Sequence, residues 1–260
     1  MSPPAATAAA NGAPLLQARG LTKAFGHVQA LADVDLDLYP NEILAIVGDN
    51  GAGKSTLIKC LSGAYVPDRG QISVGGQPAT VRTPRDAQRL GIATVYQDLA
   101  LVDQRDVATN LLMGREPRGR FGLVDRKALV RQADETLRRL NSRVPSALTP
   151  VAVLSGGQRQ AVAIGRAITQ GGRIIIMDEP TAALGVRESA QVLDLIRGLR
   201  SEGMALAVIS HNLQQVFEVA DRIHVMRGGG CVGVRRRAET SGEEIVRMIT
   251  GVDVLSAGVA

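Results

Sequence analysis

The chain contains few cysteines, few aromatic residues and no long apolar run. Its two cysteines, Cys60 and Cys231, are too few for a disulfide framework or a cysteine-based zinc site and are typical of a reducing compartment. Aromatic residues make up 2% of the sequence, which excludes stacking platforms for single-stranded nucleic acid. The densest apolar runs, ILAIVG and IIIM, have the length of strands, whereas a membrane span needs roughly 18 residues. The chain is therefore not expected to cross a membrane.

The net charge is +5, but the arginines are scattered and the densest cluster is RRR at 235–237. Attraction to phosphate, to an anionic membrane face or to no particular partner explains this charge equally well. Residues 1–14 lack the basic start and leucine-rich core of a secretion signal, so they are expected to form a disordered tail. Residues 252–260 are expected to form a C-terminal tail, and the protein is expected to be cytoplasmic.

Four short apolar runs each end at a residue of chemical interest. ILAIV precedes Gly48, IATVY precedes Gln97, IIIM precedes Asp178 and ALAVIS precedes His211. Continuous apolar strands that alternate with helical patterns predict an α/β fold with a mostly parallel sheet covered on both faces. Ligands of such sheets bind beyond the carboxyl ends of the strands, so we expect these four residues to converge on one edge.

Two regions flank this predicted core. Residues 15–40 show short apolar stretches with turn signals, and residues 71–81 have the pattern of a hairpin around Gly75-Gly76, which together predict a small antiparallel sheet. Residues 99–170 have mainly helical periodicity and predict a helical insert. Its clearest helix places four apolar residues on one face: Leu129, Ala133, Leu137 and Leu140.

The sequence after His211 completes the same unit. NLQQVFEVADRI is predicted to be helical, and IHVMRGGGCVGV is predicted to form two strands joined by a glycine turn. A last helix is predicted to begin with a Thr240/Glu243 capping pattern and to stop at Gly251. Residues 15–251 therefore form one predicted domain.

The segment GDNGAGKST, residues 48–56, has the pattern of a phosphate-binding loop. It follows a predicted strand and precedes a predicted helix, the context in which glycines let backbone N–H groups approach phosphates. Lys54 would reach the β- and γ-phosphates, and Ser55 would bind Mg²⁺. The alternative is a simple glycine-rich turn, which the strand and helix on either side argue against.

Four further side chains are candidates for the chemistry. Asp178 could hold a magnesium-bound water and Glu179 could accept a proton from an attacking water, although an acidic pair at a strand end alone is more often a helix cap or a solvated loop. His211 could contact a γ-phosphate, and Gln97 could sense magnesium or water. Each of these two is weak alone, because a solvated glutamine or a structural histidine explains it as well.

The segment LSGGQRQAVAIGRA, residues 154–167, predicts a second phosphate-binding helix start without a lysine. One triphosphate would then bridge two surfaces. The helical insert would have to fold back onto the phosphate loop of its own chain, or two identical chains would complete each other's sites head to tail.

In order along the chain, GDNGAGKST, YQD, LSGGQRQ, IIIMDEPTAAL and SHN resemble the motifs of the nucleotide-binding subunit of ATP-binding cassette (ABC) transporters. The resemblance runs from about Leu15 to Gly251. It implies a P-loop NTPase (RecA-like) fold with a mostly parallel sheet core, a flanking antiparallel β subdomain and a helical signature subdomain at about residues 99–170. It also implies ATP and Mg²⁺ as cofactors and a homodimer that encloses ATP between its subunits.

The resemblance also implies a role for particular residues. Glu179, His211 and Gln97 would be catalytic, and the metal would be held by Ser55, Gln97 and Asp178. Phe25 would stack on adenine, and a hydrophobic turn residue is nearly as good an interpretation of this position. The remaining ATP contacts would come from Gly48, Asn50, Gly51, Gly53, Lys54, Ser55, Thr56, Ser155, Gly156, Gly157 and Gln158.

Within the family, GDNGAGKSTLIKCLSG, GIATVYQDLALVDQRDVATNL and PTAALGVRES resemble the cassettes of bacterial monosaccharide importers, of the single-cassette kind. This implies an ATPase at the cytoplasmic face of the membrane that docks a permease at about residues 99–110, works indirectly with an extracytoplasmic sugar-binding protein and has no nucleic-acid partner. A nucleoside or another small polar solute, or a separate class of ABC ATPases that act on nucleic acid or ribosomes, are the alternatives.

Two glycines depart from expectation. Gly185 stands where the family commonly has an aspartate that helps to join the two active sites. Gly165, inside the signature helix, costs roughly 1 kcal/mol relative to alanine unless close packing requires it.

Overall fold

The computed structural model describes residues 12–251, so most of the predicted N-terminal tail and all of the predicted C-terminal tail lie outside the described residues. The central sheet has six strands in the order β10-β9-β3-β8-β7-β6, and every neighbouring pair except β9 and β10 is parallel. The mostly parallel sheet predicted from the sequence is therefore confirmed. Its strands are β3 (Ile43–Gly48), β6 (Ile92–Val95), β7 (Ile174–Asp178), β8 (Ala205–Ile209), β9 (Arg222–Arg227) and β10 (Gly230–Arg236).

A second, antiparallel sheet has the strand order β2-β1-β4-β5. Its strands are β1 (Leu16–Phe25), β2 (Val28–Leu38), β4 (Arg69–Val74) and β5 (Gln77–Ala79). Strands β4 and β5 are joined by Gly75 and Gly76 alone, as predicted. The flanking antiparallel sheet of the predicted fold is confirmed.

Helices cover both faces of the central sheet and form the insert. They are α1 (Lys54–Leu61), α2 (Pro84–Arg89), α3 (Val107–Leu112), α4 (Arg126–Arg139), α5 (Gly156–Thr169), α6 (Val186–Ser201), α7 (Leu213–Val219) and α8 (Gly242–Thr250). Short 3-10 turns occur at Arg120–Gly122, Val151–Val153 and Arg237–Glu239. Among residues 12–251, no helix combines the length and the apolarity that crossing a bilayer requires.

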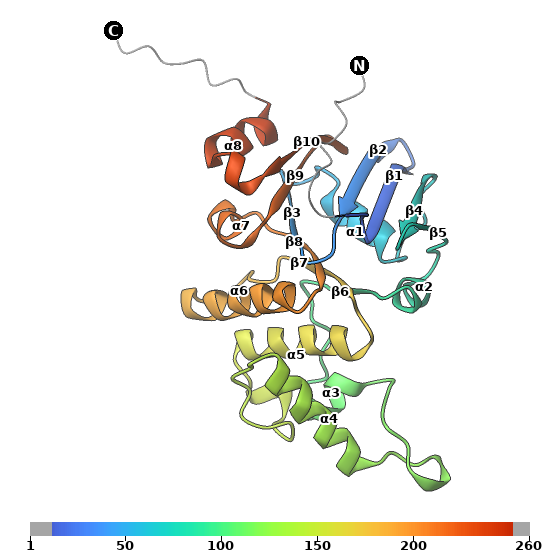
Figure 1. Cartoon of the computed structure of the whole chain (residues 1–260), viewed down its shortest axis with the longest axis vertical. Helices are drawn as coiled ribbons and strands as arrows, with labels where there is room; N and C mark the ends of the chain where they lie inside the picture. Colours follow the sequence, from blue (N-terminus) through green and yellow to red (C-terminus); the bar gives the residue numbers. More distant parts are fainter. Residues whose placement is uncertain (1–11, 252–260) are drawn as a thin grey trace.

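The alternation of strand residues separates two layers of the core. Ile174 and Ile176 of β7 pack in the cluster that contains α1 and the antiparallel sheet, whereas Ile175 and Met177 pack in the cluster that contains α5 and α6. Successive strand residues point to opposite faces, so α1 and α5 lie on opposite faces of the central sheet (Figure 1).

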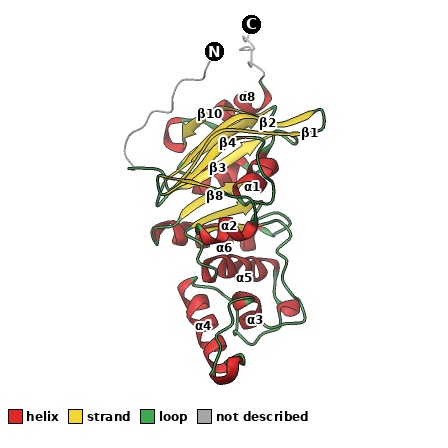
Figure 2. Cartoon of the chain, turned by 90° about the vertical axis from the view of Figure 1, so that its right-hand side faces the viewer, coloured by secondary structure: helices red, strands yellow, loops and turns green. Residues whose placement is uncertain are grey.

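The helical insert has its own apolar cluster, built by α3, α4 and the residues that lead into α5. Leu129, Ala133, Leu137 and Leu140 are all buried, which confirms the predicted apolar face. Figure 2 shows α3, α4 and α5 at the end of the molecule opposite the two sheets. The insert therefore reaches away from the antiparallel sheet, and α5 connects it to the central sheet.

Close packing explains Gly165 in the middle of α5. A Cβ atom at this position would lie 2.6 Å from Leu111 Cδ2 and 3.1 Å from Leu140 Cδ1. Both leucines are buried, so they have little room to move. The absence of a side chain lets α5 pack directly against α3 and the end of α4, which offsets the cost of glycine in a helix.

Two predicted boundaries after His211 were wrong. The last helix is capped by Ser241, whose hydroxyl accepts the Glu244 N–H at 3.2 Å, and not by the Thr240/Glu243 pair. The Thr240 hydroxyl instead donates to the Glu244 carboxylate. Helix α7 ends at Val219 and does not extend through Ile223, because the Asp221 carboxylate accepts the Ile43 N–H and thereby joins the chain to the sheet. The predicted stop of the last helix at Gly251 is confirmed.

Candidate functional site

The phosphate loop, residues 48–56, connects β3 to α1 and is held closely by the strands around it. A Cβ atom on Gly48 would lie 2.3 Å from the Met226 carbonyl oxygen, and one on Gly53 would lie 2.5 Å from the Ala30 carbonyl oxygen. Gly53 also has a φ of 100°, which favours glycine. The loop therefore packs its backbone against β2 and β9, and only glycine fits at these two positions.

The side chain of Lys54 lies inside this loop. Its Nζ donates to the Gly48 carbonyl oxygen at 2.7 Å and to the Asp49 carbonyl oxygen at 2.8 Å. Partial burial lowers the pKa of Lys54, and the negative charges of Glu179, Asp49 and Asp178 oppose that shift. The ammonium is thus held at the loop by two backbone carbonyl oxygens, where it can reach a phosphate bound to the loop.

The acidic pair at the end of β7 faces the same edge of the sheet. Burial raises the pKa of Asp178, the neighbouring Glu179 charge adds to the shift, and Lys54 and Lys59 oppose it. Glu179 has a φ of 50°, a strained backbone conformation for this residue, and its N–H donates to the Ile209 carbonyl oxygen at 3.0 Å. This hydrogen bond ties the residue after β7 to the end of β8.

His211 follows β8, the neighbour of β7, and contacts Glu179 directly. Its Nδ1 lies 2.9 Å from Glu179 Oε2. The Glu179 side chain is 15% exposed and the His211 side chain is 73% exposed, so the pair joins a half-enclosed carboxylate to a ring open to solvent. A carboxylate held by an imidazole can accept a proton from a water molecule, which supports the predicted assignment of both residues to one site.

Gln97 and Phe25 lie at the margins of this edge. Gln97 is exposed, just beyond the end of β6, which pairs with β7. Phe25 ends β1, is 43% exposed, and packs edge to face against Tyr65 with ring centroids 5.2 Å apart. Lys23 Nζ lies 5.6 Å from the Phe25 ring centre. This arrangement fits both the stacking and the structural interpretations of Phe25.

The Ser155 turn, residues 155–158, begins α5 as predicted. Ser155 caps the helix by accepting the Gln158 N–H, and Gln158 Oε1 accepts the Ser155 N–H at 3.0 Å. Gln158 Nε2 donates to the Arg143 carbonyl oxygen at 2.9 Å. Because α1 and α5 lie on opposite faces of the sheet, the structure does not bring the Ser155 turn onto the phosphate loop of the same chain.

One residue near the Ser155 turn was missed by the sequence reasoning. Glu188, in the first turn of α6, lies against Gly157 and accepts its N–H. The signal that could have revealed it is its spacing from Gly185, because an acidic residue three positions after a helix start commonly reaches back to the N–H groups there. Its contact with another helix could not be read from that spacing.

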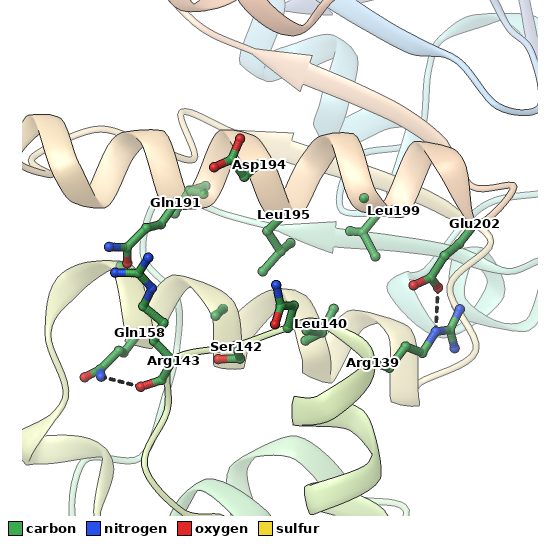
Figure 3. A pocket seen from close by; sticks show the side chains of 15 residues that line it. Arg139, Leu140, Ser142, Arg143, Gln158, Gln191, Asp194, Leu195, Leu199 and Glu202 are labelled. Carbon is green, nitrogen blue, oxygen red and sulfur yellow. Dashed lines mark hydrogen bonds and ion pairs between the residues drawn. The ribbon is translucent and has the colours of Figure 1, made fainter.

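A cavity of about 250 Å³ lies between the insert and α6. It contains neither the phosphate loop nor Glu179, and Figure 3 shows Arg143 and Gln158 at one side and Glu202 at the other. Arg139 Nε lies 2.6 Å from Glu202 Oε2, which ties the end of α4 to the residue that follows α6. The cavity thus marks the border between the insert and the central sheet with its covering helices.

The parallel sheet, the glycine-lined loop and the Glu179–His211 pair together define a P-loop nucleotide-binding protein. The ABC transporter family model matches residues 31–182, and the chain belongs to this family. It is 48% identical over 245 residues to the fructose import ATP-binding protein FrcA of Rhizobium meliloti, covering 92% of this chain and 94% of FrcA. It is 49% identical over 238 residues to the ribose import ATP-binding protein RbsA 1 of Rubrobacter xylanophilus, covering 92% of this chain and 47% of RbsA 1.

This chain therefore spans about half the length of RbsA 1 and nearly the whole of FrcA. Among solved structures, it is similar to the ADP conformation of MJ1267, an ATP-binding cassette of an ABC transporter. The TM-score is 0.78 at 26% identity, covering 91% of this chain and 95% of MJ1267. The predicted fold class and the predicted family are confirmed, and the chain is an ABC ATPase. The roles of individual site residues remain predictions.

Proposed function

We propose that this chain is the ATP-hydrolysing subunit of an importer that takes up a monosaccharide through a separate membrane permease. The observation that carries the proposal is the Glu179–His211 pair at 2.9 Å, at the sheet edge that follows the phosphate loop, in a chain that matches fructose and ribose import ATP-binding proteins over nearly its full length. An intact acid–base pair suits hydrolysis and not only nucleotide binding.

Each residue of the candidate site has a role in this proposal. Lys54 and the backbone N–H groups of residues 48–56 bind the β- and γ-phosphates of ATP. Glu179 accepts a proton from the attacking water, and His211 holds the Glu179 carboxylate in place. Phe25 stacks on the adenine, and Asn50 and Thr56 line the phosphates from either side of Lys54.

Ser55, Asp178 and Gln97 are proposed to hold Mg²⁺ directly or through water. Among residues 12–251 there is no cluster of three or more His, Cys, Asp or Glu side chains that would bind a metal. This donor set nevertheless fits Mg²⁺, which usually keeps several waters and takes one or two protein ligands together with substrate phosphates. When bound, Mg²⁺ would neutralise phosphate charge.

Two copies of the chain are proposed to enclose two ATP molecules. The Ser155 turn of one subunit faces the γ-phosphate held by the phosphate loop of the other, because α1 and α5 of one chain lie on opposite faces of its sheet. Ser155, Gly156, Gly157 and Gln158 would supply that second set of contacts. Closure of such a dimer is the motion that would move the permease.

The permease is proposed to dock on residues 99–110, which follow Gln97 and lead into the insert. The protein would then sit at the cytoplasmic face of the membrane, and an extracytoplasmic sugar-binding protein would deliver the solute to the permease. Neither the ATPase site nor residues 99–110 would touch the sugar. The proposed class of solute is therefore inferred from the relatives and not from the chemistry of any residue in this chain.

Uptake of labelled fructose, ribose and xylose by the host cell tests the proposal. Disrupting the chromosomal copy should abolish uptake of at least one of the three sugars, and the wild-type chain should restore it. The Glu179→Gln variant should not, because it removes the proton acceptor. Glu239→Gln makes the same chemical change at a side chain that is 66% exposed and should restore uptake. If the disruption leaves uptake of all three sugars unchanged, a monosaccharide is the wrong class of solute.

A further inference from the structure

Glu188 joins the start of α6 to the start of α5. Its Oε2 accepts the Gly185 N–H at 3.3 Å, which satisfies a helix end whose capping residue has no side chain. Its Oε1 accepts the Gly157 N–H at 3.5 Å. The Ser155 hydroxyl also donates to this carboxylate, and these bonds lower the pKa of Glu188. The carboxylate is therefore ionised at neutral pH and lies at the first turn of two helices.

The approach of α6 to the Ser155 turn depends on two glycines. A Cβ atom on Gly157 would lie 3.2 Å from Glu188 Cβ, and one on Gly156 would lie 2.6 Å from Leu184 Cδ2. A side chain at Gly157 would therefore press on the first turn of α6, and one at Gly156 would displace the Leu184 side chain just before α6. The two glycines thus serve a contact within the chain, in addition to leaving backbone N–H groups open to a ligand.

The partners of Glu188 are the groups proposed for the γ-phosphate of the other subunit. A carboxylate and a phosphate oxygen both accept hydrogen bonds from the N–H groups of a helix start, and both are stabilised by the partial positive charge there. Two anions at one helix start repel each other. Glu188 and the incoming phosphate therefore compete for Ser155 and Gly157.

We propose that the Glu188 carboxylate is an internal competitor of the partner subunit's γ-phosphate and is a positioning residue of the Ser155 turn. It keeps the turn formed in the single subunit and must leave Ser155 and Gly157 when the ATP-bound dimer closes. After Glu188 leaves Ser155 and Gly157, its carboxylate can still accept the Gly185 N–H. Closure of the dimer would therefore change the hydrogen bonds of Glu188 next to Gly185, the position where the family commonly has an aspartate. The inference rests on the proposed ATP-bound dimer.

Analytical ultracentrifugation in saturating MgATP tests the competition. The parent is the Glu179→Gln chain, in which slow hydrolysis should preserve the dimer. Adding Glu188→Gln should lower the dimer dissociation constant roughly fivefold, the scale of an exposed charge interaction. Glutamine keeps an oxygen that can accept the Gly185 N–H, so the start of α6 is retained. The matched control is Glu202→Gln, the same change beyond the other end of α6, and it should leave the constant unchanged.

Salt dependence separates charge competition from a purely structural role. The difference between the parent and the Glu188→Gln chain should shrink as salt rises, because the screening length falls from about 10 Å at 0.1 M to about 3 Å at 1 M. An unchanged or weaker dimer for Glu188→Gln, or a difference that ignores salt, overturns the inference.

The parent also reports on the proposed dimer itself. If the Glu179→Gln chain stays monomeric while it binds MgATP, or if Ser155→Ala leaves its dimerisation intact, the proposed ATP-bound dimer is wrong. If the parent dimerises through Ser155 and only the Glu188 result fails, the competition alone is wrong.

Discussion

The phosphate loop and the Ser155 turn are the two helix starts proposed to bind phosphate, and they differ in charge. The phosphate loop places Lys54 inside its own ring of oxygens, with carbonyl contacts at 2.7 and 2.8 Å. The Ser155 turn contains no basic residue and already has the Glu188 carboxylate against it. This difference predicts that the phosphate loop binds a triphosphate in the single subunit, whereas the Ser155 turn binds a phosphate only when another subunit presents it.

The largest expected difference between the two segments lies in nucleotide binding by the single subunit. Lys54→Met should weaken MgATP binding on the order of 100-fold, because a charged hydrogen-bond donor to the phosphates is lost. Ser155→Ala should change the affinity of the monomer less than about twofold, because this turn is proposed to act on the partner's nucleotide. Isothermal titration calorimetry at subunit concentrations below those of dimerisation measures both.

The thermal unfolding midpoint of each variant serves as the control for folding in that experiment. If Ser155→Ala weakens MgATP binding to the monomer as strongly as Lys54→Met does, the Ser155 turn contacts the nucleotide of its own subunit. The insert would then fold back onto the phosphate loop of its own chain.

The second difference concerns packing, and two helical glycines test it with opposite signs. Gly165→Ala should lower the free energy of unfolding by about 1–3 kcal/mol, because the new Cβ would lie 2.6 Å from Leu111 Cδ2. Gly198→Ala, in the exposed part of α6 with no atom within 4 Å of the new Cβ, should raise it by about 0.5–1 kcal/mol. Urea unfolding at equilibrium measures both changes. A stabilising Gly165→Ala would mean that α3 and the end of α4 pack loosely against α5.

The smallest expected effect is that of the ion pair between the insert and the end of α6. Arg139 and Glu202 are 48% and 34% exposed, so a double-mutant cycle with Arg139→Ala and Glu202→Ala should give a coupling energy below about 1 kcal/mol. Raising the salt concentration should reduce it further. A coupling above about 2 kcal/mol would mean that this ion pair holds the insert, and with it the Ser155 turn, rigidly to α6.

The fold was predictable from the sequence wherever the signal is local. The runs before Gly48, Gln97, Asp178 and His211 are strands or lead directly from one, because a strand buried on both faces must be apolar throughout. The start of α5 was also predictable, since Ser155 and Gln158 form a capping box within four residues.

Prediction failed where a distant residue decides a boundary. The helix after His211 ends early because Asp221 bonds to Ile43, which is 178 positions away in the sequence. In the candidate site, the sheet edge was predictable, but the contact between His211 and Glu179 was not predicted, because these residues follow two different strands and lie 32 positions apart in the sequence. Glu188 was missed altogether, because its second partner lies on another helix.

By itself, the sequence determined the strands, most helices, the phosphate loop and the capped start of α5. These depend on hydrophobic periodicity and on hydrogen bonds between residues only a few positions apart. The tertiary structure alone places α1 and α5 on opposite faces of the sheet. It also leaves no room for a side chain at position 165 beside Leu111, and it brings Glu188 to the Ser155 turn. Such relations arise when distant segments pack together, and no spacing along the chain encodes the distance between them.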